Sequence, residues 1–440
     1  MQPRFWQRSL PVLVVLFANL PGLVQVVANA PLRTDTDTAA MLNAMRDTGG
    51  IAGWWRWFTG DWFLHNGFYR PTTCLSLLLD YTLYGETGWG YRLTNWLLAL
   101  LTALGSYGLL RGFAHRWLSP PLTEERHAQA FALAGAVILS LQQTNALHSV
   151  QRLSVWWWIL VWLLVTGYPH SLPAWKSRLR AHWWQIGLGI GAFFWGWDRL
   201  VHSDFERLIV WVPSRTALLA TCLTVWSLRS FLHWGETGRT RYLLAAGLLD
   251  AGACGAYEQP LTAVPLVIVL AFAVRREWRW RAWVAPGIVV AIALASVALR
   301  LTLLPPTISG YQQQQLRSSP TLATRHLLQT LVPVLTHYQY WKTTGFDPYL
   351  FFFKDAWDTL AADLAFVGVL VAFWRWRRWF GWWLLWQGVT YLPMSFLHPF
   401  EHYYYLPQVG QNAVDLALVA WGMLLLRDSQ RQESGRSFAY

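Results

Sequence analysis

The sequence predicts an all-α, polytopic membrane protein with about twelve transmembrane helices, and its composition gives two reasons. Of the 440 residues, 54% are hydrophobic and only 13% are Asp, Glu, Lys or Arg. A soluble domain contains about 25% of these charged residues. The chain also has 32 Trp, 22 Phe and 17 Tyr, and Trp and Tyr gather at the two surfaces of a bilayer. This composition excludes a disordered chain and disfavours a soluble enzyme.

Long apolar runs are the third reason, because a helix that crosses about 30 Å of hydrocarbon needs roughly 20 mainly apolar residues. A window of that length predicts spans at residues 9–29, 91–111, 129–147, 152–168, 183–198, 211–231, 241–258, 260–274, 283–304, 356–374, 379–397 and 405–426. The chain is therefore predicted to be a single membrane domain over residues 1–440, with its spans between residues 9 and 426.

The basic residues predict the orientation, because cytoplasmic loops carry an excess of Lys and Arg. When the N-terminus is placed in the cytoplasm, the inner segments hold 21 of the 35 basic residues and only six of the 23 acids. The outer segments then hold the other 14 basic residues and 17 acids. Both termini are therefore predicted to be cytoplasmic.

Two outer segments, residues 30–90 and 305–355, are longer than ordinary connections, and loops of more than about 15 residues are usually functional or disordered. The segment 30–90 is rich in Trp, and we expect it to form one or two amphipathic helices on the outer membrane surface. The segment 305–355 opens with two prolines, and residues 321–336 are predicted to be helical.

Several classes of partner and cofactor are not expected. The net charge of +12 is spread over short clusters, whereas a nucleic-acid-binding protein gathers its basic residues in a patch. Cys74, Cys222 and Cys254 lie far apart, which is not the spacing of a zinc site or a disulfide framework. His398, Glu401 and His402 are close in sequence, but hydrogen bonds to a loop explain them better than a metal does. No Gly-rich phosphate loop is present, so no nucleotide site is expected.

The first candidate site residues are Asp35 and Asp37, which follow the first predicted span on the outer side. Two carboxylates there could bind a divalent cation or act as a general base on an acceptor hydroxyl. The alternative is structural, because Asp and Thr favour the N-cap position of a helix, here one that starts near Ala39.

Four short motifs follow in order, each at the outer end of a predicted span. They are Tyr69-Arg70-Pro71 with Leu79-Asp80-Tyr81, Gly85 and Gly90–Asn95; Trp211–Leu219; Tyr257–Leu261 with Pro265; and His402–Gly410. Together they resemble the motifs of GT-C membrane glycosyltransferases, in particular the membrane part of the tetratricopeptide-containing protein O-mannosyltransferases and their bacterial relatives. The likeness extends from residue 30 to about residue 425.

The resemblance implies a GT-C-like fold and sugar transfer from a polyprenyl-phosphate donor to an acceptor at the outer face of a bacterial cytoplasmic (inner) membrane. In this family an acid of the first outer loop takes the acceptor proton while the sugar is attacked with inversion, a role that falls to Asp35 or Asp37. The matched motifs place Arg70 and Arg215 as phosphate ligands. Glu258, His402 and Tyr403 would line the same site.

The phosphate role of the arginines also has a physical basis, because a guanidinium group recognises phosphate through two hydrogen bonds in one plane. Arg70, Arg152, Arg207 and Arg215 all fall at outer ends of predicted spans. The alternative for each is an interfacial side chain that reaches for water or pairs with a neighbouring acid.

The sequence also departs from the family pattern. Thr36 separates the two acids, Arg92 replaces a His, Tyr257 replaces a Lys, and His402 replaces an Arg. About 60 residues separate His148-Ser149-Val150, which resembles the family's "HP" corner, from Trp211. Either a helix pair is inserted there or one of the two matches is due to chance. A second interpretation of the chain is therefore a GT-C-like scaffold without catalysis, acting as a transporter or a structural membrane subunit.

Overall fold

The structure is a computed structural model. It describes residues 5–27, 36–118, 122–144, 187–193, 205, 207–274, 283–307, 309–316, 371, 374–397 and 400–436. These residues are helices and their connections, and the β-type pairing among them is one isolated bridge between Leu316 and Leu397. The all-α prediction is confirmed.

Contacts divide the chain into two compact units. The first unit comprises residues 1–145, 205–327 and 385–410, and the second comprises residues 146–204, 328–384 and 411–440. The helices α20 (Arg377–Tyr391) and α21 (Tyr405–Arg436) contribute residues to both units. All the elements described next belong to the first unit.

The chain begins with a bent pair of helices, α1 (Phe5–Asn19) and α2 (Pro21–Val27), whose axes differ by 47°. Pro21 explains the break, because proline lacks the N–H that would continue the helix. Asn19 is buried at the bend. Its carbonyl accepts a hydrogen bond of 2.8 Å from Trp96 Nε1, and its side chain donates one of 2.6 Å to Ser140 Oγ.

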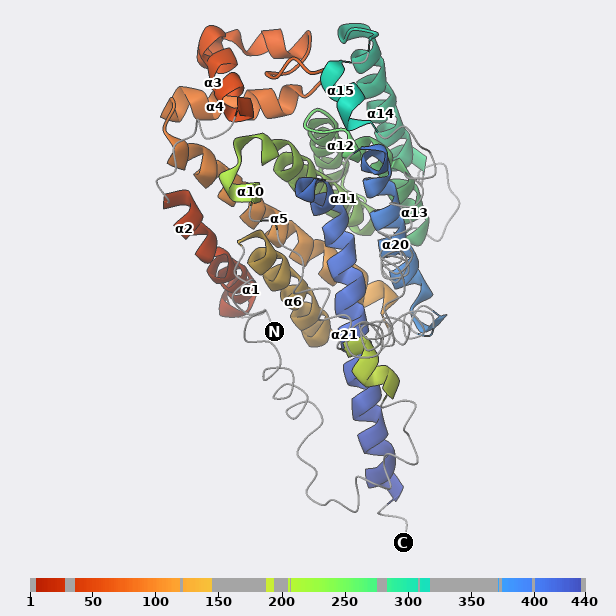
Figure 1. Ribbon diagram of the computed structural model, residues 1–440. Helices are drawn as coiled ribbons and strands as arrows, with labels where there is room; N and C mark the ends of the chain where they lie inside the picture. The colour runs from red at the N-terminus through yellow and green to blue at the C-terminus, as the bar shows by residue number, and fades with distance from the viewer. Residues whose placement is uncertain are drawn as a thin grey trace, which may run out of the picture. The chain divides into compact units, whose positions relative to one another are not determined.

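The predicted long segment 30–90 contains α3 (Thr36–Asp47), the 3-10 helix η2 (Gly50–Phe58) and α4 (Pro71–Tyr84). Met41, Leu42 and Met45 of α3 pack into an apolar cluster with residues of η2, α4 and the loop between them, including Trp57 and Leu77. In Figure 1, α3 and α4 lie at the same end of the first unit as α15.

The centre of this unit is the helix α11 (Arg215–Thr237), which packs against both α5 (Gly88–Trp117) and α12 (Thr240–Cys254) (Figure 1). Gly105 of α5 makes a close approach possible, since a Cβ there would lie 2.9 Å from Val225 Cγ1 of α11. Small residues at such positions are typical of helix pairs in membranes.

Nine other elements of this unit are described. They are α6 (Glu125–Gln143), α10 (Arg207–Val210), η3 (Val212–Ser214), η4 (Gln259–Ala263), α13 (Val264–Val274), α14 (Val284–Leu303), α15 (Gly310–Gln315), η7 (Leu392–Phe396) and η8 (Glu401–Tyr404).

Within the described part of the chain, α5 and α14 are long and apolar enough to cross a membrane, and the bent pair α1–α2 makes a third span if it is counted as one. The prediction of about twelve spans is not supported there. One reason is length, since α12 has 15 residues. Another is the break of α20 before Pro393, inside the predicted span 379–397. The predicted span 152–168, nearly all of 356–374 and just over half of 183–198 lie outside the described residues.

Candidate functional site

A cavity of about 370 Å³ lies in the first unit. Its polar lining includes Asp37 of α3, Arg70 at the start of α4, Arg207 of α10, Glu258 after α12 and His402 of η8. Five predicted site residues, which are far apart in the sequence, therefore share this cavity: Asp37, Arg70, Glu258, His402 and Tyr403.

Aromatic side chains form much of the wall, namely Trp62, Phe68, Trp211, Tyr257, Tyr311, Phe400 and Tyr403. Their rings pack on one another. For example, Phe68 and Tyr311 meet edge to face, with 6.4 Å between their ring centroids. Ligand sites are typically apolar and aromatic with a few polar groups that fix orientation. The cavity has this composition.

Arg70 is the best-defined cation of the cavity. It precedes Pro71 and the first turn of α4, and its side chain is only 9% exposed. The guanidinium carbon lies 4.6 Å from the ring of Trp62, 4.2 Å from that of Phe68 and 4.6 Å from that of Tyr257. Aromatic faces attract a cation at these distances, so the guanidinium group is fixed in an aromatic cage.

The loop that supplies two rings of this cage is braced by Asp61. Its carboxylate accepts hydrogen bonds from the backbone N–H groups of Trp62 (2.8 Å), Gly67 (2.6 Å) and Phe68 (2.9 Å). A carboxylate that accepts several backbone N–H groups holds a loop in one conformation. The sequence analysis did not single out Asp61, although an Asp before a turn with Asn and Gly is a known turn signal.

Glu258 is the anion that faces Arg70. It lies in the turn after α12, which ends at Cys254. Arg70 donates to it through Nε (3.2 Å) and Nη2 (2.8 Å), and Arg300 of α14 donates through Nη1 (2.8 Å). Burial alone would raise the pKa of Glu258, but the guanidinium groups of Arg70 and Arg300 lower it to about 2. Glu258 is therefore ionised at neutral pH and is a poor proton acceptor.

The pairing with Glu258 also affects the pKa of Arg70. Burial alone would lower the pKa, but the facing Glu258 carboxylate raises it above the ordinary value. Arg70 is therefore a permanent cation.

His402 and Tyr403 belong to η8. The ring centroid of His402 lies 5.3 Å from that of Trp211 and 5.6 Å from that of Phe400. Burial, and then the positive charges of Arg70 and Arg207, lower the pKa of His402 to about 3. At neutral pH the imidazole is therefore uncharged and can offer one donor and one acceptor. Burial also raises the pKa of Tyr403, which stays protonated.

Asp37 lies in the first turn of α3, which begins at Thr36 and not near Ala39. Asp37 is therefore inside the helix and is not its N-cap. A carboxylate in the first turn is favoured by the helix dipole. Burial, and then the negative charge of Asp37, raise the pKa of Tyr311, so the two side chains are near each other in the cavity. Asp35 lies outside the described residues.

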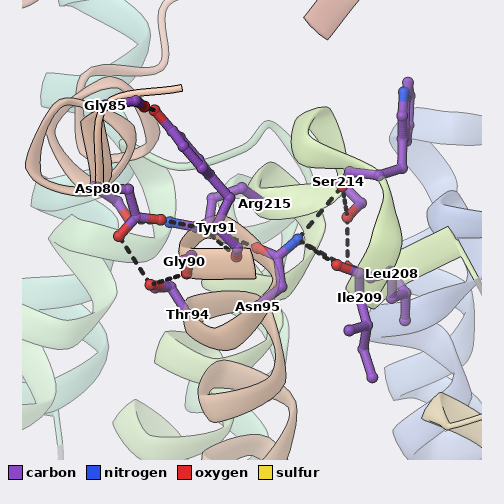
Figure 2. A network of polar contacts seen from close by, with 12 residues as sticks. Asp80, Gly85, Gly90, Tyr91, Thr94, Asn95, Leu208, Ile209, Ser214 and Arg215 are labelled. Carbon is purple, nitrogen blue, oxygen red and sulfur yellow. Dashed lines mark hydrogen bonds and ion pairs between the residues drawn. The ribbon is translucent and has the colours of Figure 1, made fainter. Parts of the chain in front are cut away.

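Arg215 does not line the cavity, and the structure corrects its predicted role as a phosphate ligand. Its side chain is completely buried, and it donates to Asp80 Oδ2 (2.6 Å), Ser76 Oγ (2.8 Å) and the carbonyl of Tyr91 (3.0 Å). A guanidinium group enclosed in this way ties α4, α5 and α11 together. Figure 2 shows the network around it.

Asn95 continues this network. Its Oδ1 accepts a hydrogen bond from Arg215 Nε, and its Nδ2 donates to the carbonyls of Leu208 (3.2 Å) and Ile209 (3.1 Å) (Figure 2). Thr94 donates a 2.8 Å hydrogen bond to Asp80 Oδ1. The matched motifs around residues 80, 95 and 215 thus meet in a structural network beside the cavity.

A metal centre has no candidate among the described residues, since no three His, Cys, Asp or Glu side chains gather there in a way that could hold an ion. Cys74, Cys222 and Cys254 are buried free thiols. The predicted cation at Asp35 and Asp37 stays a prediction, because Asp35 is not described. His398, named with Glu401 and His402 as a metal alternative, also lies outside the described residues.

Arg300 is the functional candidate that the sequence analysis missed. A signal was present, because it is the only charged residue between Val284 and Leu303, and ionisable residues in apolar helices usually face the protein interior.

Comparisons with protein-family models, with curated proteins and with solved structures give no match to this chain. The functional argument therefore depends on the cavity itself.

Proposed function

We propose that the chain is a GT-C-type glycosyltransferase, which moves a sugar from a polyprenyl-phosphate carrier to an acceptor at the outer face of the membrane. One observation carries the proposal: Asp37 lines the same aromatic cavity as the Arg70–Glu258 pair, His402 and Tyr403. This combination offers a carboxylate for the acceptor, a fixed cation for the phosphate and apolar walls for a sugar ring and a lipid chain.

In the proposed reaction, Asp37 or Asp35 takes the proton of the acceptor hydroxyl, and the acceptor oxygen attacks the anomeric carbon from the face opposite the phosphate. The bond from this carbon to the phosphate oxygen breaks, and its electrons leave with the polyprenyl phosphate. Arg70 stabilises the negative charge that develops on the leaving group. Glu258 does not compete as the base, because its pKa is about 2.

The rest of the proposal concerns the setting of the enzyme. We propose a GT-C-like membrane domain in a bacterial cytoplasmic membrane, with both termini in the cytoplasm and the cavity on the outer side. The apolar helices α5 and α14 support a membrane location. A bilayer would also supply the lipid-linked donor.

The test is sugar transfer in membranes that receive a radiolabelled polyprenyl-phosphate sugar. Asp37→Asn, alone and together with Asp35→Asn, is expected to lower transfer by a factor of about 100 or more, because a positioned general base contributes roughly 100- to 10,000-fold. Asp47→Asn is the matched control. Asp47 is the last residue of the same helix and its side chain is 76% exposed, so this variant is expected to keep its activity.

Undiminished transfer by the double variant would refute the assignment of the base. Absence of transfer by the unaltered protein, over a panel of lipid-linked sugars and acceptors, would favour the second interpretation, a GT-C-like scaffold that works as a transporter or a structural subunit. The altered motif positions and the enclosed Arg215 are the observations on its side.

A further inference from the structure

Arg300 lies in the last turn of α14 and carries a positive charge. An arginine at the end of an apolar helix usually extends its head group toward water. Arg300 instead turns into the protein, where its side chain is 13% exposed. Its Nη1 donates 2.8 Å to Glu258 Oε1, and its Nη2 donates 3.0 Å to the carbonyl of Cys254.

Glu258 is therefore shared between two arginines, and the three side chains Arg70, Glu258 and Arg300 form a triad. Arg70 Nη2 lies 2.8 Å from Glu258 Oε2, and Arg300 Nη1 lies 2.8 Å from Glu258 Oε1. One carboxylate neutralises one guanidinium group, so that the triad keeps a net charge of +1. Such an excess charge is costly in a buried position unless an anion accompanies it.

One edge of Arg70 is available to such an anion. Glu258 engages Nε and Nη2 of Arg70, whereas Nη1 has no hydrogen-bond partner within the part of the chain that the structure describes. Arg70 is 7% exposed and lines the cavity. Because Arg70 lines the cavity and Glu258 occupies Nε and Nη2, Nη1 is the nitrogen left for a ligand in the cavity. The aromatic cage prevents the guanidinium group from turning away.

We propose that the Arg70–Glu258–Arg300 triad is an anion subsite for a phosphate group, in which Arg70 Nη1 contacts the phosphate and Arg300 is a positioning residue that supplies the charge in excess. The inference rests on the proposed function for the source of the phosphate, a polyprenyl phosphate. The same chemistry would bind a soluble phosphate if that function is wrong.

The charge of Arg300 makes the inference specific. Without it, Arg70 and Glu258 would form a neutral pair. A unit charge several ångströms from an anion, at an effective dielectric constant of about 20, changes affinity by a factor of about ten or more. Arg300→Gln keeps the ability to donate hydrogen bonds and removes the charge, whereas Arg300→Lys keeps the charge.

The experiment is a binding measurement with purified full-length protein in detergent and three probes: radiolabelled undecaprenyl phosphate, undecaprenol without phosphate, and inorganic phosphate. Arg300→Gln is expected to weaken binding of undecaprenyl phosphate about tenfold and to leave undecaprenol binding unchanged. Arg300→Lys is expected to recover most of the affinity. Arg229→Gln is the matched control, because Arg229 stacks on Trp226 at 4.7 Å and does not line the cavity.

The outcomes separate the two proposals. If the unaltered protein binds undecaprenyl phosphate and Arg300→Gln binds it equally well, the inference is overturned and the proposed function stands. If only inorganic phosphate binds, and Arg300→Gln weakens that binding, the subsite stands and the lipid-linked donor does not. If neither phosphate binds, both proposals fail. A thermal melt of each variant shows whether it is folded. If the folded Arg300→Lys variant loses as much affinity as Arg300→Gln does, the role of the charge is also overturned.

Discussion

Arg70 and Arg215 have different surroundings, although both precede or begin a helix in a matched motif. The guanidinium group of Arg70 faces aromatic rings and a cavity. That of Arg215 is enclosed by Asp80, Ser76 and Asn95. A buried arginine whose donors are engaged stabilises the fold, and only an arginine with an accessible edge can contact a ligand.

The Arg215–Asp80 pair leads to a prediction about stability. Asp80→Asn leaves the guanidinium group of Arg215 buried without its counter-ion, and the expected loss is about 3–5 kcal/mol in the free energy of unfolding. Denaturant titration of the purified protein, followed by circular dichroism, measures this loss. Arg111→Gln is the control, because the Arg111–Glu125 pair is about half exposed and exposed pairs contribute about 0–1 kcal/mol. Equal stability of the two variants would contradict the structural role of Arg215.

Single residues could be predicted from the sequence where a motif or a charge in an apolar run marks them. Arg70, Glu258, His402 and Tyr403 were named in this way and share one cavity. The separation of Arg215 from them could not be predicted, because it depends on the direction in which a side chain leaves the first turn of α11. Arg300 is also a charge in an apolar run, but it was missed because no matched motif surrounds it.

Among the elements, α15 is held to the rest of the unit by few contacts. It has no buried residues, and a capping box between Ser309 and Gln312 closes its first turn. Ser309 Oγ donates 2.7 Å to the carbonyl of Asn66, and Gln312 Nε2 donates 2.8 Å to that of Gly67. These contacts place Tyr311 in the cavity wall.

Gly67 permits this contact and provides a test at the scale of the element. Its φ is +89°, which disfavours other residues, and a Cβ there would lie 2.7 Å from Gln312 Nε2. Gly67→Ala is expected to detach α15, so that the amides of residues 310–315 exchange hydrogen at least tenfold faster in mass spectrometry. Gly60→Ala is the control, because a Cβ at that position meets no atom within 4 Å. Unchanged exchange in Gly67→Ala would show that α15 is held in another way.

The described residues on either side of the segment between α6 and α10 lie next to each other in the first unit. Phe205 N donates 3.3 Å to the carbonyl of Gln142, and residues 146–204 are assigned to the second unit. Segments whose ends lie close together are typical of insertions into a domain. The two explanations that the sequence offers for this region stay predictions, because most of the region lies outside the described residues.

For the whole molecule, the clearest membrane feature is α14, which has few buried side chains and exposes Leu294, Val297, Leu299 and Leu301. An apolar helix that exposes leucines over its length fits contact with lipid. Composition therefore predicted helices that are long and apolar enough to cross a membrane. The number of spans could not be predicted in the same way, because a hydropathy window does not register where Pro21 or Pro393 divides an apolar run.

The proposed orientation can be tested with thiol labelling, since the native cysteines are all buried. Asp47→Cys is expected to react with a membrane-impermeant maleimide in intact spheroplasts, because α3 is proposed to lie outside. Arg239→Cys, an exposed position between α11 and α12, is expected to react only after the membrane is permeabilised. The opposite pattern would invert the topology and place the cavity in the cytoplasm.

The shared carboxylate of Glu258 has a consequence for the way the cavity would treat donor and product. Neither Glu258, with a pKa of about 2, nor His402, with a pKa of about 3, changes its charge between pH 5 and pH 8. Over this interval the ligand itself would titrate. A sugar-linked phosphodiester keeps one negative charge, whereas the released monoester gains a second near pH 6. The spent carrier would therefore be retained more strongly in alkaline medium, and its departure would become the slow step of turnover.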